Sequence, residues 1–146
     1  MAHKRDDATL DLFQIPAAPE PAPASMDYNR EVAHLVAKVV KEAGCDRFEI
    51  AARMSRLTGR DVSKHMIDAW AAESRDHHNI PFYLVPVLEA ACETHALSAW
   101  LADKRGGRLM VGKEVLAAEL GKLERIKDEA TQKIKELKRL MGEMES

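Results

Sequence analysis

Apolar residues recur every three or four positions through most of residues 26–108, and this spacing predicts helices that each bury one face. Asp27 and Asp46 are expected to cap the first two helices, and Gly44 and Gly59 are expected to end them in the left-handed conformation. The pattern therefore predicts an all-α domain of five helices: Asp27–Ala43, Arg47–Leu57, Val62–Ala72, one that starts after Pro81, and Leu97–Lys104.

The same spacing predicts which side chains form the hydrophobic core. Cys45 and Cys92 are the only cysteines, and without metal-ligand spacing we expect both to be small buried residues in a reducing compartment. Trp70 is expected to be a structural residue at the end of the third helix. The predicted apolar set is Val32, Leu35, Val36, Val39, Val40, Ala43, Phe48, Ile50, Ala51, Met54, Leu57, Val62, Ile67, Trp70, Leu84, Val85, Leu88, Ala91, Cys92, Trp100 and Leu101.

Two segments of different character flank these helices. Four of the six prolines lie between Ile15 and Ser25, and a Pro-rich segment of this kind favours an extended, solvated chain. Residues 110–146 contain no proline and alternate apolar with charged residues at helical spacing. The sequence therefore predicts three parts: a disordered tail over 1–25, the helical domain over 26–108 and a long helix over 110–146.

The C-terminal segment follows the heptad rhythm of a coiled coil. Only one polar residue, Lys127, falls at a predicted core position, where it would lie opposite the small Ala130 in an antiparallel pair. We expect this helix to form a homo-oligomer, a dimer or a tetramer. Its core positions are Leu120, Lys127, Ile134 and Met141 at a, and Leu116, Leu123, Ala130, Leu137 and Met144 at d.

The charges beside this seam predict the orientation of the pair. A parallel pair would place Glu119 near Glu124 and Lys133 near Lys138, and both contacts repel. An antiparallel pair would place Glu119 opposite Lys133 and Glu124 opposite Lys138, and both contacts attract. The pattern therefore favours an antiparallel pair, and the alternative is a single helix that packs on its own domain.

Charge and composition narrow the possible functions. The net charge is −2, and residues 46–76 hold six basic and six acidic residues, so binding to nucleic acid would have to depend on local patches.

The chain has no Gly-rich phosphate loop and no nucleophile elbow, so we do not expect an enzyme. His65, His77, His78 and His95 lack metal-ligand spacing, so we expect no metal or cofactor. Without an apolar run of about 20 residues, no membrane span is expected and the cytoplasm is the expected compartment.

Residues 58–101 resemble the CII-type and Mu-like prophage helix-turn-helix regulators. The resemblance extends over about Glu31 to Asp103, and it is carried by VSKHMIDAW and by the proline-started LVPVLEAAC segment that follows. It implies a phage-repressor-like helix-turn-helix domain whose third helix enters the major groove of double-stranded DNA.

The resemblance also implies which residues contact DNA. Ser63, Lys64 and His65 take the base-reading positions, where Lys64 can donate to guanine. Arg60, just before the helix, is better placed for a phosphate, and Asp68 can only accept, for example from cytosine. The alternative is that these residues form a solvated helix face with no partner.

A second basic element follows the fifth helix. It contains Lys104, Arg105 and Arg108, separated by two glycines. It is either a clamp on the phosphates that flank the recognition site or a polar helix end, where cations favour the helix dipole.

These expectations lead to two hypotheses of different class. The first is a sequence-specific DNA-binding transcriptional regulator of phage type, associated with the nucleoid of a bacterial host. The second is a non-enzymatic protein-interaction adaptor that uses the C-terminal helix and the N-terminal tail. In the tail, Leu10, Leu12 and Phe13 resemble the pentapeptide by which bacterial replication proteins bind the sliding clamp, although Thr9 stands in place of its glutamine.

Overall fold

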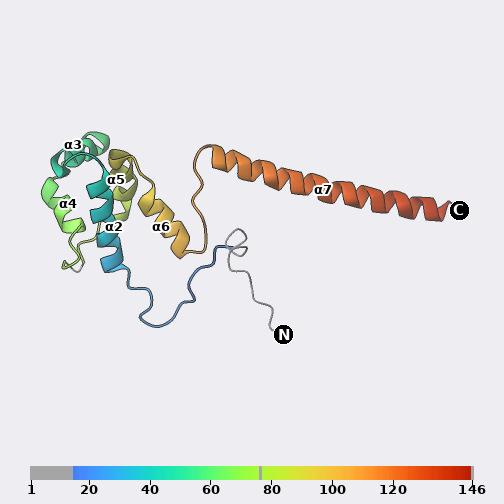
Figure 1. Ribbon diagram of the computed structural model, residues 1–146, viewed down its shortest axis with the longest axis horizontal. Coiled ribbons are helices and arrows are strands. Elements are labelled where there is room, and N and C mark those ends of the chain that lie inside the picture. Colours follow the sequence, from blue (N-terminus) through green and yellow to red (C-terminus); the bar gives the residue numbers. More distant parts are fainter. Residues whose placement is uncertain (1–14, 76, 146) are drawn as a thin grey trace, which may run out of the picture. The chain divides into compact units, whose positions relative to one another are not determined.

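The computed structural model describes residues 15–75 and 77–145, and over these residues the protein is helical with no strand. The chain divides into two compact units, one ending at Leu109 and one starting at Met110. The first unit is a bundle of short helices (Figure 1). Its elements are α2 (Asn29–Glu42), α3 (Arg47–Thr58), α4 (Lys64–Trp70), the 3-10 turn η2 (Phe82–Leu84), α5 (Val85–Cys92) and α6 (Ala96–Lys104).

Local capping decides where the first two helices begin and end. Helix α2 starts at Asn29 and not at Asp27 as predicted, because the Asp27 carboxylate accepts a bond from the Asn29 amide and Tyr28 becomes the N-terminal flanking residue. The predicted cap of α3 is confirmed: Asp46 Oδ1 accepts from the Glu49 amide at 2.8 Å. Gly59 ends α3 with φ of 66°, a conformation that side chains disfavour, and its amide donates to the Ser55 carbonyl.

Helix α4 is shorter than the predicted Val62–Ala72 helix. Ser63 is extended and its hydroxyl accepts a bond from the Met66 amide, so the helix starts at Lys64. Val62 is buried although it lies outside the helix. The hydroxyl of Ser55 accepts from the Val62 amide at 2.9 Å and donates to the Val62 carbonyl at 3.1 Å, which ties this residue to α3.

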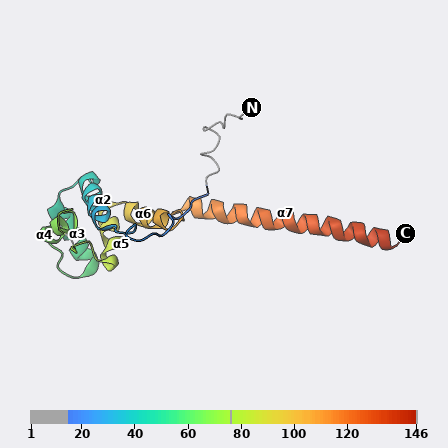
Figure 2. The same cartoon turned by 90° about the horizontal axis from the view of Figure 1, so that it is seen from below.

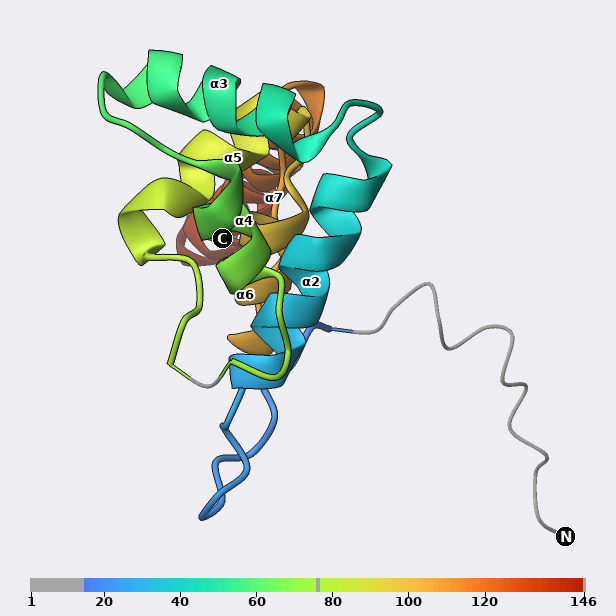
Figure 3. The same ribbon diagram turned by 90° about the vertical axis from the view of Figure 1, so that its left-hand side faces the viewer.

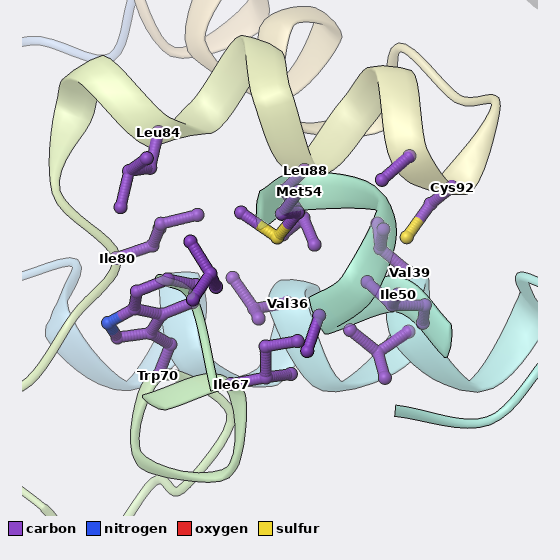
Figure 4. Close-up of a cluster of buried hydrophobic side chains, with 14 of the residues drawn as sticks. Val36, Val39, Ile50, Met54, Ile67, Trp70, Ile80, Leu84, Leu88 and Cys92 are labelled. Carbon is purple, nitrogen blue, oxygen red and sulfur yellow. The ribbon is translucent and has the colours of Figure 1, made fainter. Parts of the chain in front are cut away.

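One core holds the bundle together (Figure 4). Trp70 and Ile67 of α4 point into the same cluster as Met54 of α3 and Leu88 of α5 (Figure 4), and Trp70 is only 6% exposed. Helix α3 runs across the bundle, with α4 beneath it (Figure 3). The cluster consists of Val36, Val39, Val40, Ile50, Ala51, Met54, Val62, Ile67, Trp70, Ile80, Leu84, Leu88, Ala91, Cys92 and Leu97.

Three predicted core residues are on the surface. Phe48 is 67% exposed and lies under the Lys64 ammonium, Leu57 is 60% exposed in the last turn of α3, and Leu101 is 43% exposed beside an open groove. Each has the right helical spacing, but no neighbouring helix covers it.

Cys92 is buried, and this burial raises the pKa of its thiol to about 11, whereas Cys45 is only half-buried.

Helix α6 is held at its N-terminus by a buried carboxylate of α5 that the sequence pattern does not reveal. Glu89 is 5% exposed, and its Oε2 accepts from the Ser98 amide at 3.0 Å while its Oε1 accepts from the Ser98 hydroxyl at 2.5 Å. His95, at the capping position, makes no side-chain cap bond. Glu89 therefore supplies the anionic partner that this helix end needs.

The Pro-rich stretch has no regular structure over residues 15–22, and its side chains are exposed, but its backbone contacts the bundle. A Cβ built on Gly106, where φ is 74°, would lie 2.5 Å from the Ala18 nitrogen. The predicted tail therefore has no regular secondary structure here and rests against the end of α6. Residues 1–14, with the Leu10, Leu12 and Phe13 motif, lie outside the described residues.

The second unit is one uninterrupted helix, α7 (Lys113–Met144), which is visible along its whole length in Figure 2. None of its residues is buried, and its leucine, isoleucine and methionine side chains are largely exposed. Among the described residues, no helix is both long and apolar enough to cross a membrane.

Candidate nucleic-acid interface

Helices α3 and α4 form two consecutive, packed helices joined by the short turn Gly59–Ser63. The left-handed Gly59 reverses the chain, and Ser63 caps the next helix, so each local signal in the sequence has a direct role in the turn. Helix α4 buries Ile67 and Trp70 and leaves the side chain of its second residue, His65, exposed. This is the arrangement in which a second helix can present its first turn to a partner.

The residues predicted to contact DNA lie around this turn, and they differ in their exposure and in the bonds that they already make. Arg60 and His65 are exposed. Ser63 is half-buried, and its hydroxyl already accepts the capping bond from the Met66 amide. Lys64 Nζ lies 2.8 Å from Asp68 Oδ2 and 5.5 Å from the centroid of the Phe48 ring, so it bridges α4 and α3.

Asp68 lies at the centre of an ion-pair cluster that the sequence analysis did not identify. Its Oδ1 accepts from Arg47 Nη1 at 2.6 Å, and its Oδ2 accepts from Lys64. The bonds from Lys64 and Arg47 hold the pKa of this carboxyl below its usual range. Arg47, the missed residue, comes from the first turn of α3, and only the packing of α3 on α4 brings it to Asp68. Asp68 therefore orients two cations, and both of its oxygens are already bonded without DNA.

The second basic element lies away from this surface. Helix α4 and the C-terminal end of α6 lie at opposite ends of the bundle, with α2 and α5 between them (Figures 1 and 2). The basic residues near α4 and those from Lys104 to Arg108 therefore do not form one continuous face. Arg105 and Arg108 are exposed at their own end of the bundle.

Lys104 is tied into the fold. Its Nζ lies 2.8 Å from Glu31 Oε1, 5.0 Å from the Tyr28 ring centroid and 5.9 Å from the Trp100 centroid. Trp100 Nε1 also donates to Glu31, so the bonds from Lys104 and Trp100 lower the pKa of Glu31, and the bond to Glu31 raises the pKa of Lys104. These contacts join α2 to α6, and this lysine is a structural residue in the bundle.

The surface of α3 and α4 carries only a small excess of positive charge. Glu49 lies within 3.2 Å of Arg53 and 3.6 Å of Arg56, just as Asp68 pairs with Arg47 and Lys64. Both acidic side chains of α3 and α4, Glu49 and Asp68, are therefore bonded to cations of the same two helices. The charge that this surface offers to a polyanion comes from the more numerous arginines and lysines between residues 47 and 64.

An open apolar groove lies on another part of the bundle, between α2, α6 and the start of α5. It encloses about 890 Å³ and is lined mainly by apolar and aromatic side chains, among them Val32, Phe82, Trp100 and Leu101. Among the described residues that line its wall, Arg105 is the only charged one. Within the described part of the chain, no three His, Cys, Asp or Glu side chains are placed to hold a metal ion.

Comparison with protein-family models, curated proteins and solved structures found no match to this chain. The resemblance to CII-type regulators therefore rests on the sequence motifs alone. The geometry of α3 and α4 is the basis for any assignment of function.

Proposed function

We propose that this protein is a sequence-specific DNA-binding transcriptional regulator that uses α3, the Gly59 turn and α4 as a helix-turn-helix. The observation that carries the proposal is the short, capped α4, packed by Ile67 and Trp70, with its first turn and the preceding Arg60 on the surface. The protein would act in the cytoplasm of a bacterial host, on double-stranded DNA.

The residues have distinct roles in this proposal. An α-helix fits the major groove, and its N-terminal residues meet the base edges, so Lys64 and His65 are the base-reading candidates. Arg60 would bind a phosphate from the turn. Arg47 and Asp68 would position Lys64, which would exchange its bond with Asp68 for one to guanine O6 or N7.

Binding to sequenced fragments of bacterial genomic DNA, followed by titration of the enriched site, tests the proposal. Lys64→Ala should weaken binding to that site by about 1–3 kcal/mol and relax the preference at one base position. Arg60→Ala should weaken binding to all sequences alike and reduce the salt dependence. Lys38→Ala, on an exposed part of α2, is the matched control and should leave both unchanged.

No enrichment of any fragment at 50 mM salt by the wild-type chain would refute the proposal. An equal loss of DNA affinity in Lys64→Ala and Lys38→Ala would show that charge alone, and not the α4 surface, drives the binding.

The second candidate is a protein-interaction adaptor, which the only slightly positive α3–α4 surface and the open apolar groove favour. In this case Leu10, Leu12 and Phe13 would bind a host sliding clamp. Leu12→Ala with Phe13→Ala should then abolish binding to the purified clamp, whereas the DNA-binding proposal expects this double change to leave DNA affinity intact.

A further inference from the structure

Helix α7 exposes an apolar stripe along its full length. It has 32 residues, which is about 48 Å of helix, and none of them is buried. A continuous apolar stripe on a solvated helix marks an interaction surface, because its burial against a partner is strongly favourable. The stripe consists of Leu116, Leu120, Leu123, Ile126, Ile134, Leu137, Leu140, Met141 and Met144, which are between 43% and 87% exposed.

We propose that the partner is α7 of a second copy, paired antiparallel over the whole helix, with the twofold axis between Asp128 and Glu129. The heptad core is symmetric about this point, because Leu120 then meets Leu137 and Leu123 meets Ile134.

The core register depends on the spacing of the apolar residues, which also places Leu116 opposite Met141. An isologous contact of this kind needs such self-complementarity, whereas an unrelated partner would not.

The residues beside the seam select the antiparallel orientation. Glu119 lies opposite Lys133 of the other copy, and Glu124 lies opposite Lys138, so four attractive pairs form in the dimer. Ile126 is at a g position, and near the axis it meets Ile126 of the second copy. In a parallel pair Ile126 would instead lie beside Thr131, and each acidic residue would lie beside another acid.

The proposal is independent of DNA binding, and its first test is the molar mass of the full chain in solution. Light scattering at tens of micromolar should give a dimer or a larger assembly, in DNA-free buffer. A monomer throughout this range would overturn the proposal.

A single charge reversal tests the orientation. Glu119→Lys places lysine opposite Lys133 in the antiparallel pair, so the dissociation constant should rise roughly 2- to 30-fold at low salt and less at high salt. In a parallel pair the same change would place lysine opposite Glu124 and tighten the assembly. A lower dissociation constant for Glu119→Lys would therefore overturn the antiparallel arrangement.

Two further variants control for helix formation and net charge. Glu136→Lys makes the same charge change at a c position, away from the seam, and should leave the dissociation constant unchanged. Adding Lys133→Glu to Glu119→Lys should restore the wild-type value, with the helix content from circular dichroism constant across the series. The register would be refuted if Glu136→Lys raised the dissociation constant as much as Glu119→Lys, or if the double variant did not regain the wild-type dissociation constant.

Discussion

Asp68 orients the charged side chains on the surface of α4. Its carboxylate accepts bonds from Arg47 and Lys64, which lower its pKa in the folded protein. A lowered pKa means that the ionised form is favoured by folding. The contribution to stability is therefore complete above the unfolded value of about 3.9 and is lost as the pH falls through the lower folded value.

Asp68→Asn should lower the free energy of unfolding at pH 7 by about 0.5–1 kcal/mol, since the pair is partly exposed. The difference from the wild type should shrink as the pH falls below 4, approximately, because the native carboxylate is then increasingly protonated. Urea denaturation at pH 7 and at acidic pH measures both values. Asp61→Asn removes an exposed acid of the same surface and serves as control. An equal loss at both pH values would show that the ion pairs do not stabilise the fold.

At the scale of the element, the N-terminus of α6 is bonded by the Thr94 hydroxyl, which accepts from the Ala96 amide, and by a carboxylate of the preceding helix. His95 makes no side-chain bond to the helix, and the free amide of Ser98 is bonded by Glu89 from the preceding helix. This contact couples the two helices, because α6 cannot separate from α5 without leaving a buried carboxylate unpaired.

Glu89→Ala should lower the free energy of unfolding by about 1–3 kcal/mol, since the Ser98 amide and hydroxyl lose their partner in a buried site. Glu89→Gln keeps one acceptor oxygen and should lose less. Thermal or urea unfolding measures the series, with Glu42→Ala at the exposed end of α2 as control. A Glu89→Ala variant as stable as the wild type would mean that water replaces the bond without cost.

At the scale of the whole molecule, the core and the exposed helix α7 are separate units of the chain. Every residue of the core cluster lies between Val36 and Leu97. The stability of the first unit should therefore not require α7, whereas self-association should require it.

A chain that ends at Leu109 should unfold with a free energy within about 0.5 kcal/mol of that of the full bundle and should be a monomer. If the protein binds DNA as an α7-linked pair, this shortened chain should also bind its site far more weakly, because two linked domains bind with a higher effective concentration. Light scattering, thermal melting and DNA titration measure the three properties. A shortened chain that still dimerises would place the self-association surface in the bundle.

The sequence by itself determined the local structure. The periodic apolar residues predicted helices that correspond to α2 to α7, and Asp46 and Gly59 predicted the cap and the end of α3, because helix formation and capping depend on residues within a turn or two of each other. The burial of Ile67 and Trp70 followed from the same spacing, because the α4 face on which they lie is covered by the helices around it.

Only the tertiary structure decided which side chains are covered and which charges meet. Phe48 and Leu101 share the helical spacing of core residues but stay exposed, because no neighbouring helix covers them. The pairs Arg47–Asp68 and Lys104–Glu31, and the position of the second basic element far from α4, depend on how the helices pack. Helical periodicity specifies a direction around one axis, whereas burial and ion pairing depend on the crossing of several axes, which no single segment encodes.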